Sequence, residues 1–304
     1  MSSISSLAQL QSKLKHENID VFIINRSDEF LNEYIAPYAE RLHFITHFSG
    51  SAGKAIILQN KAYLYVDGRY TFQADEQINS NEIKSRHLNL FWDDLKKIIV
   101  KQNCVIAVDP KLHSIKEIQT IQELTTNTST SIKFLKTNIV DKIWKNKPKI
   151  EYSNIFDHPI KFAGSDRTEK LNNFFDFLNK NNINKYLVTG LDNIAWLLNI
   201  RADDILYTPL VFSYLLVSKN HKSSLYIKHD KINDKLKIEL EKYINIQSIE
   251  DINDIFSKID KDDIVGLDFS TTTYYFLKQL EDNKIQYKDI TCLLYTSDAA
   301  DDRV

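Results

Sequence analysis

The first half of the chain contains Val21-Phe-Ile-Ile, Ala55-Ile-Ile-Leu and Tyr63-Leu-Tyr-Val, three short apolar segments. Three similar segments follow in the same order in the second half, namely Leu187-Val-Thr, Tyr214-Leu-Leu-Val and Leu225-Tyr-Ile. Short runs rich in β-branched and aromatic residues are typical of buried strands. The two sets lie about 160 residues apart, which is the size of a domain, so the sequence predicts a tandem duplication.

Helical patterns alternate with these strands. Leu7, Leu10 and Leu14 recur at helical spacing after a serine-rich start, which predicts a helix over residues 5–17. Further helices are predicted at 114–124, 168–181 and 192–199. Later strands are predicted at Val105-Ile-Ala-Val and Ser131–Leu135, and Asp263-Ile-Val-Gly-Leu-Asp parallels Cys104-Val-Ile-Ala-Val-Asp. This alternation predicts an α/β fold in which helices flank mixed sheets.

The predicted organisation is two domains joined by a lysine-rich segment. The first domain covers residues 1–135, the linker 136–165 and the second domain 166–291. The linker carries Lys136, Lys142, Lys145, Lys147 and Lys149 with little periodicity, which favours a solvated connection. A basic patch that binds anions is the alternative.

Composition excludes several classes of protein. The chain has 304 residues, and 39 Lys and Arg balance 41 Asp and Glu, so the net charge of −2 is too neutral for a dedicated nucleic-acid or membrane-surface binder. No apolar run approaches the roughly 18 residues that span a bilayer. The N-terminus has no basic region followed by an apolar run, so no secretory signal is expected. With two cysteines, Cys104 and Cys292, a cytoplasmic location is expected.

The glycines indicate one turn with special geometry. Only six glycines occur in the chain, and three of them fall within residues 50–68. Gly50-Ser-Ala-Gly-Lys does not match a phosphate-binding loop, because Phe48 stands where that loop needs its first glycine and Ala55 follows the lysine. The interpretation is a tight turn packed against its neighbours.

No metal centre or catalytic set can be assembled from the spacing of polar residues. His43 and His47 are four residues apart, but Phe44 stands where a helical zinc pair needs its glutamate. Acidic pairs such as Asp203-Asp204 are adjacent, so their side chains point apart. We therefore expect no catalytic residue and no metal or other cofactor in this chain.

Asp67-Gly-Arg-Tyr is the best functional candidate. Asp67 can cap the helix that follows, and Arg69 offers a planar fork for a carboxylate. The alternative is an internal ion pair that stabilises the turn between strand and helix.

Several longer stretches are similar to a known family. They include Ser27-Asp-Glu-Phe-Leu-Asn-Glu-Tyr-Ile-Ala-Pro, Phe48-Ser-Gly-Ser-Ala-Gly, Val66-Asp-Gly-Arg-Tyr-Thr-Phe-Gln-Ala and Leu191-Asp-Asn-Ile-Ala-Trp-Leu-Leu-Asn-Ile-Arg-Ala-Asp-Asp-Ile. Together they resemble, over residues 5–290, the first two domains of the long, three-domain Xaa-Pro aminopeptidases (aminopeptidase P).

The resemblance implies a specific architecture. Members of that family have two creatinase-like α/β domains, followed by a pita-bread catalytic domain that holds two divalent metals, usually manganese. The enzymes remove an N-terminal residue that precedes proline and form homodimers. No position of this chain matches the metal ligands, so the chain is expected to be inactive alone, with proline-containing peptides bound through the missing domain.

The resemblance also suggests roles for individual residues. The first domain of the family helps to shape the substrate entrance, and Arg69, Asp67 and Arg41 are the candidates for entrance or interdomain contacts. The alternative function is a non-catalytic creatinase-like module that binds peptides or proteins. Residues 292–304 resemble translated adapter sequence and are expected to be a non-native tail.

Overall fold

The chain forms two compact units, each built on a six-stranded sheet. The computed structural model describes residues 4–101, 104–219 and 222–290. The first unit comprises the chain up to Glu29 together with Glu33–Ile150, and the second comprises Phe30–Asn32 together with the chain from Glu151 onward. The tail predicted at 292–304 lies outside the described residues.

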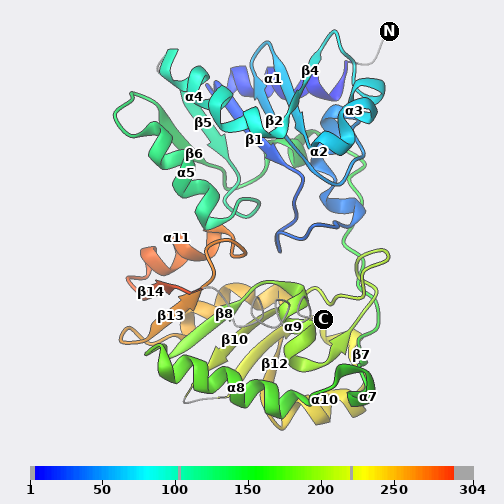
Figure 1. Cartoon of the computed structure of the whole chain (residues 1–304), viewed down its shortest axis with the longest axis vertical. Helices are drawn as coiled ribbons and strands as arrows, with labels where there is room; N and C mark the ends of the chain where they lie inside the picture. The colour runs from blue at the N-terminus through cyan, green and yellow to red at the C-terminus, as the bar shows by residue number, and fades with distance from the viewer. Residues whose placement is uncertain (1–3, 102–103, 220–221, 291–304) are drawn as a thin grey trace. The chain divides into compact units, whose positions relative to one another are not determined.

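The first unit contains six strands and six α-helices within the described residues (Figure 1). Its strands are β1 (Val21–Asn25), β2 (Gly53–Leu58), β3 (Ala62–Val66), β4 (Ile83–His87), β5 (Val105–Val108) and β6 (Ser131–Phe134). Its helices are α1 (Ser6–His16), α2 (Arg41–Thr46), α3 (Thr71–Gln77), α4 (Phe91–Lys101), α5 (Ile115–Thr125) and α6 (Ile139–Ile143). Short 3₁₀ turns η1, η2 and η3 cover Pro37–Ala39, Gly68–Tyr70 and Leu88–Leu90.

The second unit continues with eight strands and five α-helices within the described residues. Its strands are β7 (Phe156–Asp157), β8 (Lys185–Val188), β9 (Ile200–Arg201), β10 (Tyr214–Ser218), β11 (Ser223–Ile227), β12 (Ile244–Ser248), β13 (Ile264–Leu267) and β14 (Gln286–Asp289). Its helices are α7 (Ile160–Ala163), α8 (Arg167–Lys180), α9 (Leu191–Leu198), α10 (Asp234–Glu241) and α11 (Tyr274–Asp282), with 3₁₀ segments η4 (His229–Lys231) and η5 (Ile249–Lys258).

The two large sheets have the same topology. The first has the order β4-β3-β2-β1-β5-β6 and the second the order β12-β11-β10-β8-β13-β14. In both, the central strand pairs antiparallel on one side, β1 with β2 and β8 with β10, and parallel on the other, β1 with β5 and β8 with β13. The predicted duplication and the mixed sheets are therefore confirmed.

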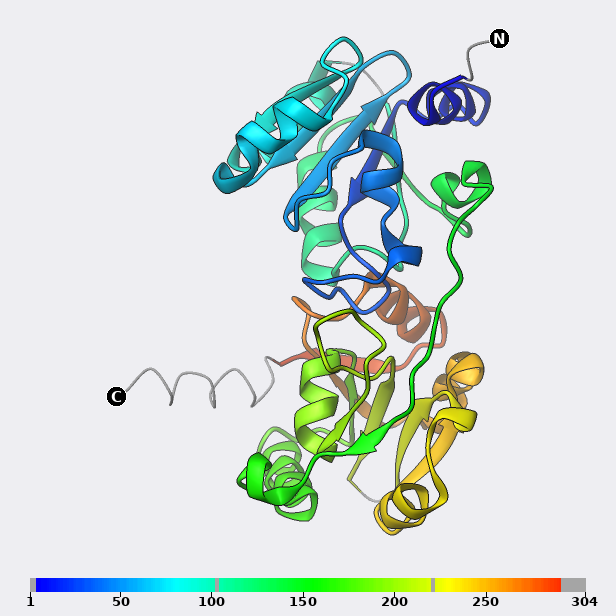
Figure 2. The same cartoon turned by 90° about the vertical axis from the view of Figure 1, so that its right-hand side faces the viewer.

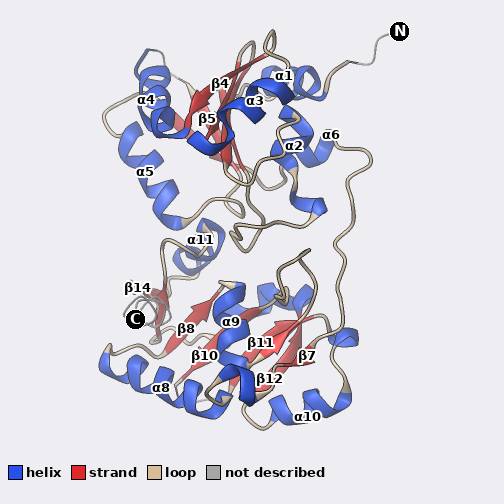
Figure 3. Ribbon diagram, turned by 45° about the vertical axis from the view of Figure 1, so that its right-hand side comes forward, coloured by secondary structure: helices blue, strands red, loops and turns tan. Residues whose placement is uncertain are grey.

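Helices cover both faces of the first sheet (Figure 3). Leu7, Leu10 and Leu14 of α1 join Phe22 and Ile24 of β1 in one apolar core, which also takes residues of α2, α3 and α6. Strand residues that point the other way, such as Ile23 and Ile106, are buried as well, as are Leu95 of α4 and Ile118 of α5. Because both faces of the central strand are covered, β1 is buried along its whole length.

Side-chain caps determine where several of the predicted helices begin. The Ser5 hydroxyl accepts a hydrogen bond from the Ala8 amide at 3.2 Å, and the Ser114 hydroxyl accepts one from the Glu117 amide at 3.1 Å. Asp166 accepts from the amides of Thr168 and Glu169 at 2.7 and 2.9 Å. Each cap satisfies amides that the first helical turn leaves without a partner.

The structure divides the chain differently from the predicted linker of 136–165. Residues 139–143 form α6, and Ile139, Val140 and Ile143 are buried in the core of the first unit. The boundary between the units falls after Ile150. The longest part of the predicted linker without a helix or regular strand is residues 144–155, an extended segment between α6 and β7 (Figure 2). The lysine-rich composition favoured the prediction of a linker, but part of this sequence forms a short helix whose inward face is apolar.

A partly buried ion pair in the first unit stands where the second unit has two aromatic rings. The Lys54 Nζ atom on β2 lies 2.6 Å from Glu117 Oε1 on α5, and the His113 Nδ1 atom lies 3.1 Å from Glu117 Oε2. The matching sheet registers place Tyr214 at the position of Lys54 and Phe276 at that of Glu117. The Tyr214 and Phe276 rings are 5.2 Å apart. One framework thus accepts a charged pair or an apolar pair at the same place.

This equivalence predicts the outcome of a double-mutant cycle. Glu117→Leu and Lys54→Met should each destabilise the first unit, Glu117→Leu by about 2 kcal/mol or more, because Glu117 is the shared partner of Lys54 and His113 and only 10% of its side chain is exposed. The double variant should lose at least about 1 kcal/mol less than the sum of the two single losses. Urea unfolding of the four proteins measures this coupling, and strictly additive losses would contradict it.

The same pair predicts a pH dependence. Burial alone would raise the pKa of the Glu117 carboxyl, but the charges of His113 and Lys54 outweigh burial and hold that pKa well below its usual value of 4.5. Because folding lowers the pKa of Glu117, its ionised carboxyl stabilises the folded state fully above about pH 4.5. This contribution to the free energy of unfolding is lost as the pH falls further. Between pH 5 and pH 2 the stability of the Glu117→Gln variant should therefore fall less steeply than that of the natural sequence.

Candidate functional site

The structure separates the three predicted site residues into two places. Asp67 and Arg69 form a local pair at the turn between β3 and α3, where Arg69 Nε lies 2.8 Å from Asp67 Oδ1. The Arg69 side chain is 69% exposed, and Asp67 also accepts a hydrogen bond from the Arg69 amide at 3.0 Å. The hydrogen bond from Arg69 lowers the pKa of the Asp67 carboxyl. Asp67 caps the turn as predicted, and Arg69 remains accessible to solvent.

Arg41 instead lies inside the first unit. Its side chain is 4% exposed, and its Nε and Nη2 atoms donate to the two carboxylate oxygens of Asp141 at 2.9 and 3.0 Å. The Nη2 atom also lies 3.2 Å from Glu29 Oε1. Burial works against the charge of Arg41, but Asp141 and Glu29 raise the pKa of the guanidinium. This bidentate pair joins α2 to α6 across 100 residues of sequence.

Arg41 is also part of the wall of a cavity of about 350 Å³. The wall contains three segments that follow strands: Glu29 after β1, Asp109 and Lys111 after β5, and Lys136, Thr137 and Asn138 after β6. Strands β1, β5 and β6 are parallel, so their carboxyl ends meet at one edge of the sheet. Ligands of open α/β sheets bind outside that edge. We call this cavity the carboxyl-edge pocket.

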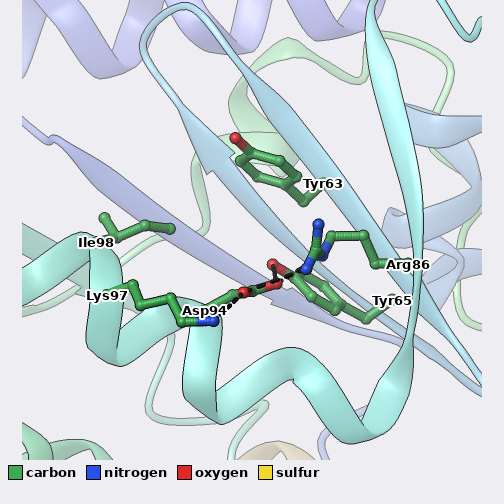
Figure 4. Close-up of a pocket in the computed structure, with 6 residues that line it drawn as sticks. All are labelled: Tyr63, Tyr65, Arg86, Asp94, Lys97 and Ile98. Atoms are coloured by element: carbon green, nitrogen blue, oxygen red, sulfur yellow. Dashed lines mark hydrogen bonds and ion pairs between the residues drawn. The ribbon is translucent and has the colours of Figure 1, made fainter.

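A smaller cavity of about 170 Å³ lies between β3, β4 and α4 (Figure 4). Asp94 is at its centre, where it accepts a hydrogen bond from the Tyr65 hydroxyl at 3.2 Å and pairs with Arg86 at 2.6 Å. Burial, followed by the charge of Asp94, raises the pKa of Tyr65. Asp94 is therefore already paired with Arg86 and hydrogen-bonded to Tyr65. The volume of the cavity is also smaller than the roughly 300 Å³ of typical ligand sites.

A third cavity of about 340 Å³ lies in the second unit, where the polar groups hold structural positions. Asp166 caps α8, and Arg167 pairs with Asp157 while its Nε atom donates to the Leu198 carbonyl at 3.0 Å. Glu239 pairs with Lys242 on the surface of the unit. These contacts serve the ends of α8, α9 and α10 rather than a common centre.

The glycine-rich turn packs as predicted. A Cβ atom at Gly50 would come within 2.2 Å of the Phe48 ring, and one at Gly53 would meet the Leu42 side chain at 3.2 Å. The Ser51 hydroxyl lies 2.6 Å from the Tyr70 hydroxyl. The glycines therefore let two segments approach closely, and no phosphate-binding loop is formed.

The Leu191–Ile205 stretch, which carries much of the family resemblance, serves as scaffold. Asn199 ends α9 in the left-handed region, with φ of 50°, and its side chain accepts from the buried Lys170 Nζ at 2.7 Å. Asp204 accepts from the amides of Ser153 and Phe212 at 2.6 and 2.8 Å. These contacts give Asn199 and Asp204 structural roles within the second unit.

No metal centre is formed within the described ranges 4–101, 104–219 and 222–290, where no three His, Cys, Asp or Glu side chains gather as ligands. The His43 and His47 rings lie 6.4 Å apart at right angles, and His43 contacts the Phe48 carbonyl. Within the same ranges, no helix is long and apolar enough to cross a membrane.

The contacts of Arg41 and Arg69 predict that replacing Arg41 lowers stability and that replacing Arg69 does not. Arg41→Met should destabilise the protein by about 3 kcal/mol, because it leaves Asp141 and Glu29 without their buried partner. Arg69→Met removes an exposed pair and should leave the unfolding midpoint unchanged. Thermal unfolding followed by circular dichroism compares the two variants. Equal midpoints would show that Arg41 is not the structural residue that its contacts indicate.

Comparison with known proteins identifies the architecture. Models of the creatinase/prolidase N-terminal domain match residues 7–138 and 146–295. A probable Xaa-Pro aminopeptidase P of Neosartorya fischeri is 36% identical over 230 residues, which cover 74% of this chain and 35% of that protein. A similarly named protein of Ajellomyces dermatitidis is 33% identical over 255 residues, which cover 82% of this chain and 40% of that protein.

A solved structure shares the fold. The X-prolyl aminopeptidase of Caenorhabditis elegans, described as a cytosolic enzyme with a di-nuclear active site, has a TM-score of 0.84 and 24% identity. The match covers 95% of this chain and 50% of that one. The chain thus spans between about a third and a half of the length of these proteins. With both units matched by the same kind of model, the chain belongs to the creatinase/prolidase N-terminal domain family and contains two such domains, which are similar in sequence to part of the proteins named Xaa-Pro aminopeptidase P.

Proposed function

We propose that this chain is the substrate-entrance and oligomerisation part of a cytoplasmic Xaa-Pro aminopeptidase. The observation that carries the proposal is the similarity to Xaa-Pro aminopeptidase P, at 33–36% identity, which extends over 74–82% of the chain. The relatives are more than twice as long as the matched region, which leaves room for a catalytic domain. In this proposal, hydrolysis of the bond before proline takes place in that further domain.

The proposal assigns the metals to the same further domain. A pair of divalent ions, manganese in this account, would activate the water that attacks the peptide bond. The described residues offer no set of ligands for such a pair, so the 304-residue chain should not release amino acids from Xaa-Pro peptides, with or without added manganese. Metal-dependent release by the purified chain, after removal of contaminating peptidases, would contradict this assignment.

Arg69 is the residue proposed to contribute to the entrance. It is the most accessible of the three predicted site residues, and its guanidinium is positioned by Asp67 at 2.8 Å. An exposed guanidinium can attract the C-terminal carboxylate of an incoming peptide. Arg41 would act indirectly, by holding α2 and α6 through Asp141.

A chimera tests the entrance and oligomerisation roles. Residues 1–290 of this chain would replace the matching part of the Neosartorya fischeri relative, and the remaining part of that relative, expressed alone, is the control. The chimera should form a homodimer by light scattering and should hydrolyse Xaa-Pro peptides with a lower KM than the control. Arg69→Ala in the chimera should raise KM for peptides with a free carboxylate more than for their amides.

Two outcomes would overturn the proposal. A folded chimera whose KM and oligomeric state equal those of the control would remove both roles. If the folded chimera has no peptidase activity and the 304-residue chain binds peptides by itself, the results favour the non-catalytic binding module.

A further inference from the structure

The carboxyl-edge pocket has the location and size of a ligand site. It lies outside the carboxyl ends of β1, β5 and β6, where the sheet changes from antiparallel to parallel pairing. Its volume of about 350 Å³ falls within the range of small-molecule sites, which begins near 300 Å³. All of its lining residues belong to the first unit, so the pocket is complete within that unit.

The carboxylates in the pocket are already engaged. Asp141 accepts from Arg41 and lies 2.9 Å from Lys147 Nζ. Glu29 accepts from the Tyr38 hydroxyl at 2.9 Å and from Arg41. Asp109 accepts from the Asn138 side chain at 3.0 Å. A cation would therefore have to displace contacts that the protein makes for itself.

The charges that line the pocket leave a surplus of one positive charge. Arg41, Lys111, Lys136 and Lys147 carry four positive charges, and Glu29, Asp109 and Asp141 carry three negative ones. Lys111 and Lys136 are exposed residues, and Lys111 also makes an interaction within the protein. A monoanion matches this surplus, whereas the second negative charge of a phosphate dianion exceeds it.

Arg41 adds a second, independent observation. Its Nη1 atom is buried and has no hydrogen-bond partner within the described part of the chain, although Nε and Nη2 are both engaged. Buried donors in native proteins almost always have an acceptor. The atom has almost no exposed surface, so an acceptor oxygen of a ligand would reach it only after the side chains that cover it move aside.

We propose that the carboxyl-edge pocket binds a small ligand through one carboxylate group. The lysines Lys111 and Lys136 attract the carboxylate, and the Arg41 guanidinium, fixed by Asp141, marks the inner end of the site. This inference rests on the geometry of the first unit alone and does not depend on the proposed peptidase role.

A titration followed by NMR tests the proposal with matched probes. N-acetylglycine carries one carboxylate, and N-acetylglycinamide is its neutral counterpart. In the full chain, the amides of Asp109, Lys111, Lys136 and Asn138 should shift saturably with the acid and not with the amide. Inorganic phosphate at the same concentration should bind more weakly than the acid.

Variants of exposed lysines locate the binding without unfolding the protein. Lys136→Gln and Lys111→Gln should each raise the Kd for N-acetylglycine about two- to fivefold, as expected for one partly exposed charge. Lys145→Gln is the matched control, because Lys145 is exposed in the same lysine-rich segment but does not line the pocket. Equal binding of the amide, tighter binding of phosphate, or equal effects of Lys145→Gln and Lys136→Gln would each overturn the proposal.

Discussion

The two opposite pairing directions of the central strand determine the rest of each unit. Strand β1 bonds antiparallel to β2 and parallel to β5, and it is buried along its length. Because β5 and β6 run parallel to β1, the loops after these three strands gather at one edge. Glu29, Asp109 and Lys136 come from distant parts of the sequence and lie together at that edge. Strand β8 occupies the same position in the second unit.

One framework therefore carries two different sets of side chains. The pair of Lys54 and Glu117 in the first unit corresponds to Tyr214 and Phe276 in the second. A buried ion pair often contributes no more to stability than well-packed apolar residues of similar size. The charged version is thus not required by the fold. The carboxyl edge of the first unit carries further charges in its pocket, and the second unit places its own charged groups elsewhere, as at Asp166 and Arg167.

The sequence was sufficient for the parts of the fold that have a strong local signal. The repeated apolar segments correctly indicated β1, β2 and β3 and their counterparts, because these strands are buried on both faces. Strand β4, Ile83–His87, escaped prediction, because only Ile83 is buried and the other positions are polar. Asp67 and Arg69 are two residues apart, so their pairing could be anticipated. The contact of Arg41 with Asp141 spans 100 residues, and no local pattern identifies such a partner.

Hydrogen exchange measured on individual amides of the full chain tests the central claim most directly. If both units are organised around a central strand that pairs in two directions, the amides of β1 and β8 should be the slowest to exchange in their units, and they should open only with global unfolding of the unit. Amides of the outer strands β4 and β14 should exchange faster, through local opening. Exchange of β1 or β8 at the rate of these outer strands would contradict the account.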